Sequence, residues 1–180
     1  MTEDITIIVA EQAEENMILK HYPGIKCIRT GVGASNVIKT CCRLPEGSRI
    51  FNIGYAGSNK LPVGTVTFVS ETRRLMSDDY KFEDYHNPLA FGAQLQEKGY
   101  PCYTSNSFVT RSDIVEPVLF DMELNYIAAF PLQLEGSIKI VSDNLCVDSF
   151  MNNAIRETGI LTSEKVWNQV FEMFENLNIR

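Results

Sequence analysis

Two short motifs place a carboxylate where it could take part in catalysis. Met122-Glu123 opens a predicted helix, whose N-terminus can direct the Glu123 carboxylate into a pocket. Ser142-Asp143 ends a predicted strand, which places an acid at the tip of a buried strand. Each acid also has an ordinary structural explanation, since Glu123 can interact with the helix dipole and Asp143 can cap the following turn.

Two glycine-rich segments each follow a predicted strand. They are Gly31-Val32-Gly33 and the Gly-Tyr-Ala-Gly segment at 54–57. Glycine lets the backbone turn tightly and approach a ligand closely, although a glycine turn after a strand is often only a turn. The first segment is not a dinucleotide-binding fingerprint, because Asn36 stands where that motif has its third glycine.

These motifs lie near the ends of strands that alternate with helices. The predicted strands are 5–10, 26–30, 49–53, 64–70, 101–105 and 137–142, and the predicted helices are 11–20, 35–42, 121–130 and 163–177, the last with Thr162 as N-cap. Residues 71–96 are polar and irregular, which indicates a surface loop. We therefore predict a single α/β domain over 1–180, a three-layer αβα arrangement around a mixed, mainly parallel sheet, with ligand beyond the carboxyl ends of the strands.

Composition excludes several classes of function. The net charge of -7 and the sequence pI of about 4.9 disfavour nucleic acid as a partner. No segment reaches the roughly 18 apolar residues of a membrane span, so a soluble, cytoplasmic protein is expected. Five cysteines without CxxC spacing and two distant histidines predict reduced thiols, no metal site and no cofactor.

In chain order, these segments together resemble the nucleoside phosphorylase and nucleosidase superfamily, most closely the methylthioadenosine/S-adenosylhomocysteine nucleosidases, over about residues 5–145. The similar segments are 7–10 with Glu14, 31–33 with Asn36, 52–57, 63–67, 105–108, Met122-Glu123 and Ser142-Asp143. The chain departs from the family in a shorter segment between Glu14 and Gly31, which implies a smaller sheet, and at three positions. Tyr55 stands in place of a small Ser, where it could crowd the water, Lys139 in place of Arg, and Asn106 in place of Gly.

The resemblance implies hydrolysis of the N-glycosidic bond of a purine nucleoside similar to methylthioadenosine or S-adenosylhomocysteine, through an oxocarbenium-like ribosyl species. Asp143 would protonate the base as general acid, and Glu14 would activate water, with Glu11 and Glu15 as alternatives in the same turn. The other implied substrate contacts are Glu123 and Met122 at the ribose, Phe108 and the backbone of Val109 at the base, Ser142 beside Asp143, and Gly33, Tyr55, Ala56 and Gly57.

Water is favoured over phosphate as the nucleophile. Phosphorolysis needs cations around a dianion, and the strand alternation points Arg29 away from the expected pocket. A phosphorylase, a nucleoside-binding protein without catalysis and a purely structural domain are the alternatives. The resemblance also implies that the chain forms a homodimer. Its expected ligand is a small molecule, a purine nucleoside.

Overall fold

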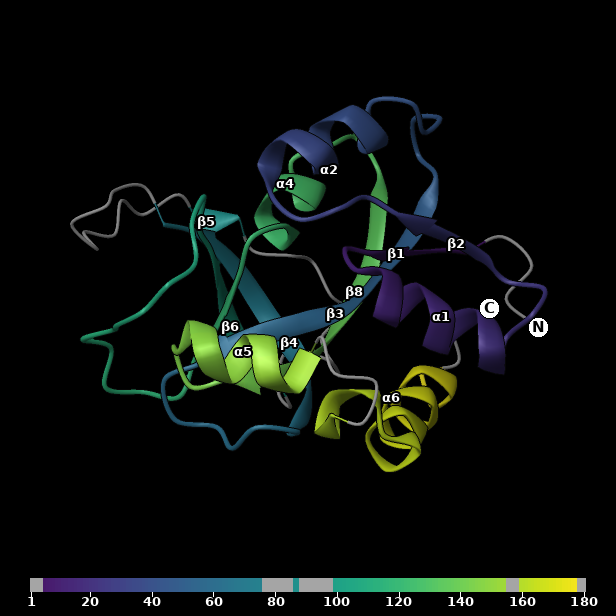
Figure 1. Cartoon of the computed structure of the whole chain (residues 1–180). Coiled ribbons are helices and arrows are strands. Elements are labelled where there is room, and N and C mark those ends of the chain that lie inside the picture. Colours follow the sequence, from purple (N-terminus) through teal and green to yellow (C-terminus); the bar gives the residue numbers. More distant parts are fainter. Residues whose placement is uncertain (1–4, 76–85, 88–98, 155–158, 178–180) are drawn as a thin grey trace.

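A computed structural model of the chain describes residues 5–75, 86–87, 99–154 and 159–177 (Figure 1). The strands are β1 (Thr6–Val9), β2 (Lys26–Arg29), β3 (Arg49–Ser58), β4 (Val66–Arg74), β5 (His86–Asn87), β6 (Tyr100–Thr104), β7 (Leu119–Asp121) and β8 (Gln133–Asp143). The helices are α1 (Gln12–His21), α2 (Ala34–Cys41), α4 (Leu124–Ala128), α5 (Val147–Ala154), the 3-10 turn η1 (Ile160–Thr162) and α6 (Glu164–Glu175).

All described strands belong to one mixed sheet, and most of their pairings are parallel. The parallel pairs are β1 with β2 and β3, β3 with β8, and β6 with β4 and β7. The antiparallel pairs are β3 with β7, and β4 with β5 and β8. The prediction of a mixed, mainly parallel sheet is therefore confirmed.

The prediction of a plain three-layer sandwich is wrong, because part of the sheet closes on itself. Strands β3, β8, β4, β6 and β7 pair in turn and return to β3, which makes a closed barrel, while β1 and β2 extend from β3 as a parallel wing. The register of β3 against β8 shifts at Ile50/Phe51 and at Ala56/Gly57. Such irregularities bend a strand. The bending lets the long strands β3 and β8 pair with each other both in the barrel and beside the open wing.

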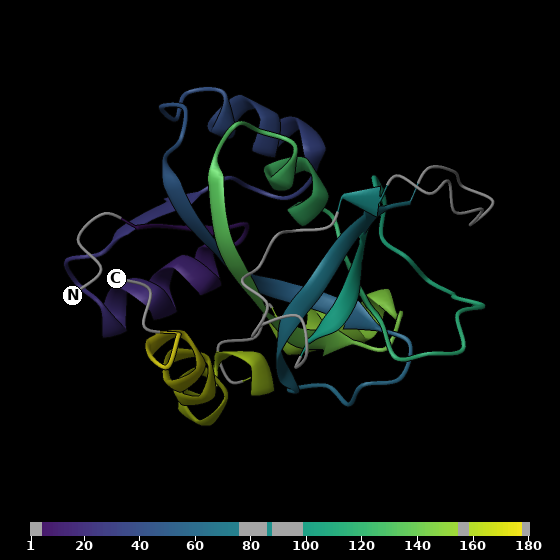
Figure 2. The ribbon, with the colours of Figure 1, turned by 180° about the vertical axis from the view of Figure 1, so that it is seen from behind.

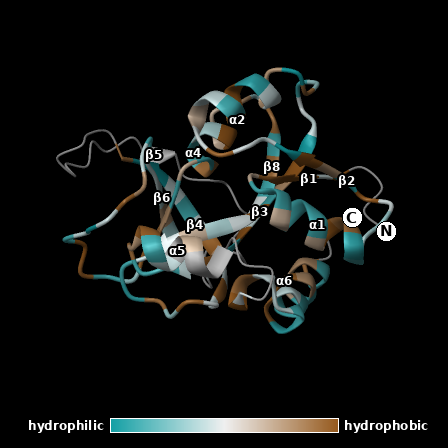
Figure 3. Cartoon of the chain, viewed as in Figure 1, coloured by the Kyte–Doolittle hydropathy of each residue, from teal (hydrophilic) through white to brown (hydrophobic). Residues whose placement is uncertain are grey.

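Helices cover both faces of the wing. Ile7 packs in a core cluster with Ile18 of α1 and Trp167 of α6, whereas the next residue, Ile8, packs with Val37 of α2 and Ile127 of α4. Consecutive strand residues point to opposite faces, so an unbroken apolar run suits a strand covered on both sides. Figure 1 shows α2 and α4 on one side of β1 and α1 and α6 on the other, and Figure 3 shows the hydrophobic colour along β1.

Several predicted boundaries change in the structure. The segment 54–57 is not a turn, because β3 continues through it to Ser58, and helix 121–130 shortens to α4, because Leu119–Asp121 forms β7. The N-cap of α6 is Ser163 rather than Thr162, since the Ser163 side chain accepts a hydrogen bond from the Val166 N–H. Of the predicted loop 71–96, residues 71–74 belong to β4 and 86–87 form β5, while the remainder lies outside the described residues apart from Leu75. Helix α5 was not predicted.

The final helix is part of the core. Its buried residues follow helical spacing, and Phe174 meets Phe51 of β3 edge-on with ring centroids 4.9 Å apart. Figure 2 shows α6 from the opposite side, beneath the curved path of β8.

We expect Phe174→Ala to lower the free energy of unfolding by about 3–5 kcal/mol, because it removes a buried aromatic ring and leaves a cavity. Urea denaturation followed by the fluorescence of Trp167, the single tryptophan, measures this change. Glu172→Ala, at an exposed position of the same helix, is the matched control and should change stability by less than about 0.5 kcal/mol. Equal effects of the two substitutions would contradict a core role for α6.

Candidate active site

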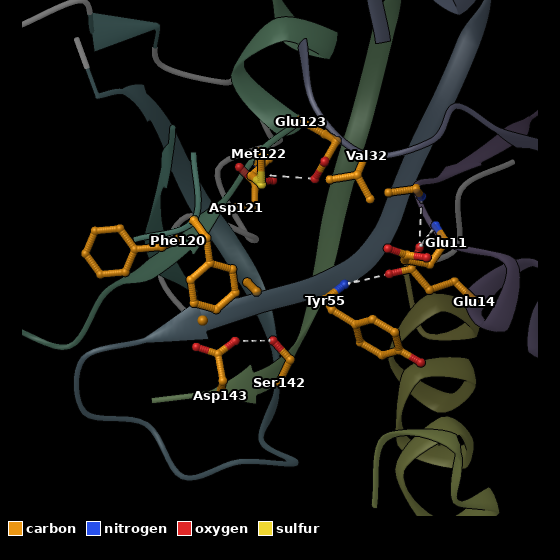
Figure 4. Close-up of a pocket in the computed structure, with 14 residues that line it drawn as sticks. Glu11, Glu14, Val32, Tyr55, Phe120, Asp121, Met122, Glu123, Ser142 and Asp143 are labelled. Atoms are coloured by element: carbon orange, nitrogen blue, oxygen red, sulfur yellow. Dashed lines mark hydrogen bonds between the residues drawn. The ribbon is translucent and has the colours of Figure 1, made fainter. Parts of the chain in front are cut away.

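A cavity of about 180 Å³ opens where β1, β7 and β8 end and β3 passes beneath (Figure 4). Nine residues predicted from the sequence line it: Glu14, Tyr55, Ala56, Gly57, Phe108, Met122, Glu123, Ser142 and Asp143. A second cavity of about 30 Å³ shares Phe108, Met122 and Asp143 with the first and adds Val109. Gly33 does not line either cavity, but it contacts Glu123 directly.

Glu14 lies in the first turn of α1 and is held by three backbone donors. Its Oε2 accepts hydrogen bonds from the N–H of Ala10 at 2.8 Å and of Glu11 at 2.7 Å, and its Oε1 accepts one from the N–H of Tyr55 at 2.8 Å. The side chain is 1% exposed, and burial raises the pKa of Glu14 to about 7 despite these donors. A carboxyl group with this pKa is suited to accept a proton near neutral pH.

Gly54 and Gly57 of β3 leave space for carboxylate side chains to contact the strand. This role differs from the tight turn expected from the sequence at 54–57. A β-carbon at Gly54 would lie 3.3 Å from Glu14 Oε1 and 3.5 Å from Lys139 Nζ. A β-carbon at Gly57 would lie 3.0 Å from Asp143 Oδ1. The missing side chains therefore let both carboxylates rest against the same strand, three residues apart.

Glu123 follows β7 and is the N-cap of α4. Its Oε1 accepts a hydrogen bond from the Gly33 N–H at 2.7 Å, and its Oε2 accepts one from the Met122 N–H at 3.2 Å. Burial, and then the negative charge of Asp121, raise the pKa of Glu123 to about 7. A β-carbon at Gly33 would lie 3.9 Å from Met122 Cε. The Gly31-Val32-Gly33 turn therefore contacts both Met122 and Glu123 in this wall of the cavity.

Asp143 ends β8 at the opposite side of the cavity from Glu14 (Figure 4). Its Oδ2 accepts a hydrogen bond from Ser142 Oγ at 2.7 Å, and its Oδ1 accepts bonds from the N–H groups of Leu145 at 2.8 Å and Cys146 at 3.3 Å. Burial raises the pKa of Asp143, and the hydrogen bonds, led by that of Ser142, oppose the rise. The raised pKa favours the protonated form that a proton donor needs.

The Tyr55 side chain does not fill the cavity. Its ring points away from Phe120 and Asp143 in Figure 4 and packs in the core cluster that contains Leu161 and Trp167. The concern that this phenol crowds a water beside the substrate is therefore not supported by its position. Tyr55 contributes its backbone N–H, which binds Glu14.

Glu11, named from the sequence as an alternative to Glu14, also lines the cavity, and four further lining residues were not among the predicted contacts: Ala10, Val32, Phe120 and Asp121. Asp121 forms a buried ion pair with Lys139, with Nζ 2.8 Å from Oδ2, and its Oδ1 accepts a hydrogen bond from Thr104 Oγ1 at 2.6 Å. Burial is the largest single influence and lowers the pKa of Lys139, but the surrounding groups, led by Asp121 and including Cys102 and Glu123, together outweigh burial, and the pKa is raised. The sequence could have indicated this ion pair. Lys139 lies inside the apolar run 138–141, and a buried lysine needs an acidic partner.

The described lining is rich in carboxylates and contains no arginine or lysine side chain. Arg29 is exposed, and it hydrogen-bonds Gln12 and pairs with Glu15 through Nε and Oε2 at 3.5 Å. Glu15 is therefore placed away from the cavity, while Glu11 and Glu14 line it. Such a lining stabilises positive charge on a bound molecule and repels a phosphate dianion.

Three further observations concern metal ligands, cysteines and membrane spans in the described part of the chain. Within those ranges, no three His, Cys, Asp or Glu side chains are grouped so that they could hold a metal ion. The five cysteines are free. None of the described helices has the length and apolar character needed to cross a bilayer.

Several solved structures share this fold. The chain matches no protein-family profile and no curated protein sequence. It aligns with a methylthioadenosine/S-adenosylhomocysteine nucleosidase variant of Helicobacter pylori that holds 5′-methylthioadenosine in its active site (14% identity, 96% of this chain, 100% of that chain, TM-score 0.69). It also aligns with the nucleosidases of Chlamydia trachomatis bound to methylthioadenosine (16%, 97% and 99%, 0.66) and of Neisseria meningitidis in complex with methylthio-immucillin-A (17%, 94% and 98%, 0.65).

At these identities the alignment establishes the fold. The resemblance indicated by the sequence motifs is confirmed at that level, and the chain has the fold of the methylthioadenosine/S-adenosylhomocysteine nucleosidases.

Proposed function

We propose that the chain hydrolyses the N-glycosidic bond of a purine nucleoside and releases the free base and a ribose derivative. The observation that carries this proposal is the convergence of Glu14, Glu123 and Asp143, from three separate elements, on one cavity. The solved nucleosidases of this fold that hold methylthioadenosine or adenine support a purine nucleoside as the ligand class.

Departure of the base is assigned to Asp143. A purine leaves more readily when its five-membered ring accepts a proton, and the buried Asp143 is disposed to carry one. Ser142 holds the carboxyl group in place through its 2.7 Å hydrogen bond. Phe108, which lines both cavities beside Asp143, stacks on the base, and the backbone of Val109 pairs with the purine edge.

Activation of water is assigned to Glu14 at the other end of the cavity. The three backbone donors fix its carboxylate. Strand β3 contacts Glu14 at Gly54 and Asp143 at Gly57. At about 3.3 Å per residue those glycines are about 10 Å apart, so the two acids contact β3 at separate points. The cavity that both acids line is assigned to the sugar and the attacking water.

The ribose is assigned to Glu123 and Met122. Glu123 would accept hydrogen bonds from the sugar hydroxyls, and these bonds strengthen as positive charge develops on the ring. Met122 lies in the same wall and packs beneath the sugar. The backbones of Ala56 and Gly57 form the floor, and Gly33 orients Glu123.

Hydrolysis is preferred to phosphorolysis because the described lining offers carboxylates and no cationic side chain to a dianion. The homodimer and the cytoplasmic location expected from the sequence stay predictions.

The purified protein is expected to release adenine from adenosine-type nucleosides at a rate that does not depend on phosphate. Liquid chromatography of the free base, with and without inorganic phosphate, measures this. Release that requires phosphate would assign the chain to the phosphorylases. Binding of adenine in a calorimeter without turnover over hours would instead favour a non-catalytic nucleoside-binding protein.

Asp143→Asn is expected to reduce kcat about 10² to 10⁴-fold, because asparagine keeps the shape but cannot donate the proton. Ser142→Ala is the companion variant and should cost less, since it removes only one hydrogen bond to that carboxyl group. A loss below tenfold in Asp143→Asn would remove Asp143 from the acid role.

The pH profile should reflect the carboxylates that must be ionised. Because Glu14 has to be deprotonated to accept a proton from water, kcat/KM is expected to fall as the pH drops below about 7, whereas loss of the Asp143 proton limits kcat/KM on the alkaline side. Glu123 has a similar pKa, so this acid limb belongs to both groups. In Glu14→Gln, kcat should fall about 10² to 10⁴-fold with adenine affinity retained, and a flat profile between pH 5 and 8 in the unaltered protein would contradict the assignment.

A further inference from the structure

Glu11 is a cavity-lining carboxylate that the proposed reaction leaves without a role. Glu14, Glu123 and Asp143 act in that reaction, and Asp121 is neutralised by Lys139. Glu11 is the N-cap of α1, where its backbone N–H is fixed by Glu14 Oε2 and its side chain takes part in the capping box. Capping explains why an acid is tolerated there, but it does not explain why the acid faces a ligand cavity.

The position of Glu11 follows from the groups already assigned, so this inference rests on the proposed function. With the base at Asp143 and Phe108, and the ribose diol at Glu123, the lining residues still without a role are Ala10, Glu11, Val32 and Phe120. Phe120 also lines the second cavity with Phe108 and Asp143, at the end assigned to the base, which leaves Ala10, Glu11 and Val32 at the other end. Figure 4 shows Glu11 and Val32 across the cavity from Asp143. The one substituent of a nucleoside left to occupy this end is the group on its 5′ carbon.

A carboxylate at this end discriminates between 5′ groups by charge. An apolar 5′ group such as methylthio would cover Glu11 and take the carboxylate out of water without supplying a donor. An anionic 5′ group would be repelled, because the nearby basic side chain, Arg29, is engaged by Gln12 and Glu15 outside the cavity. A protonated amine would donate a charge-assisted hydrogen bond to Glu11, about twice as strong as a neutral one.

We propose that the substrate is a purine nucleoside whose 5′ substituent carries an ammonium group, and that Glu11 binds this group. The site thereby shares its fold with methylthioadenosine nucleosidases but selects a cationic tail in place of an alkylthio tail.

The test compares two adenine nucleosides that differ at the 5′ carbon, 5′-amino-5′-deoxyadenosine and 5′-methylthioadenosine, at pH 7. The unaltered protein should have a kcat/KM about tenfold or more higher for the amino compound, the effect of one hydrogen bond to a charged group. In Glu11→Gln, which keeps a capping oxygen but removes the charge, the ratio of the two values should fall toward one. Because the ratio is taken on the same preparation, partial unfolding of the variant does not change it.

Glu15→Gln is the matched control, since Glu15 lies in the same turn but pairs with Arg29 outside the cavity. It should leave the ratio unchanged. Raising the pH until the substrate amine is neutral should abolish the preference of the unaltered protein, which tests the charge without any substitution. Equal or faster cleavage of methylthioadenosine, or an unchanged ratio in Glu11→Gln, would overturn the inference, whereas absence of free adenine from both nucleosides would overturn the proposed function.

Discussion

The candidate site depends on how closely side chains can approach the backbone of β3. Gly54 and Gly57 carry no side chain, and carboxylate oxygens of Glu14 and Asp143 lie 3.3 Å and 3.0 Å from the positions where their β-carbons would stand. A larger residue at Gly57 would meet Asp143 at 3.0 Å, which is too close for ordinary packing. The two points at which these acids contact β3 are thus fixed by residue spacing along one strand.

The second constraint is charge. Lys139 is 1% exposed and sits among acids, with its ammonium group bonded to Asp121 and near the same point of β3 as Glu14 Oε1. A buried lysine of this kind stays charged only because it is paired, and it partly offsets the repulsion among the surrounding carboxylates. Asp121 is in turn held by Thr104 and by the Leu124 N–H, so the charge balance is tied to the geometry of β6, β7 and α4.

Local patterns predicted the elements well where a strand or helix has a strong repeat. Strand β1 was predicted because burial on both faces produces a continuous apolar run. Helix α6 was predicted because burial along one stripe produces apolar residues at helical spacing. Strand β7 was missed because three residues are too short for any periodicity, and its omission lengthened the predicted helix that follows. Barrel closure was missed because it depends on register shifts between β3 and β8, which no local pattern encodes.

The same distinction applies to the site. Glu14, Glu123 and Asp143 were named because their motifs match in order, and the structure places them around one cavity. The Asp121–Lys139 pair joins two strands across the fold, and the orientation of Tyr55 depends on α6, which is more than a hundred residues away. Pairings of this kind arise from topology and not from neighbouring residues.

Strand β3 has a further consequence for how such a chain can change length. It pairs with β1, β7 and β8 at once, so the wing and the barrel share one backbone segment. Neither part can be removed without leaving unpaired strand edges on the other. Insertions and deletions are therefore confined to the connections between elements, and a short chain of this fold has to keep β3 and its partners intact while trimming what joins them.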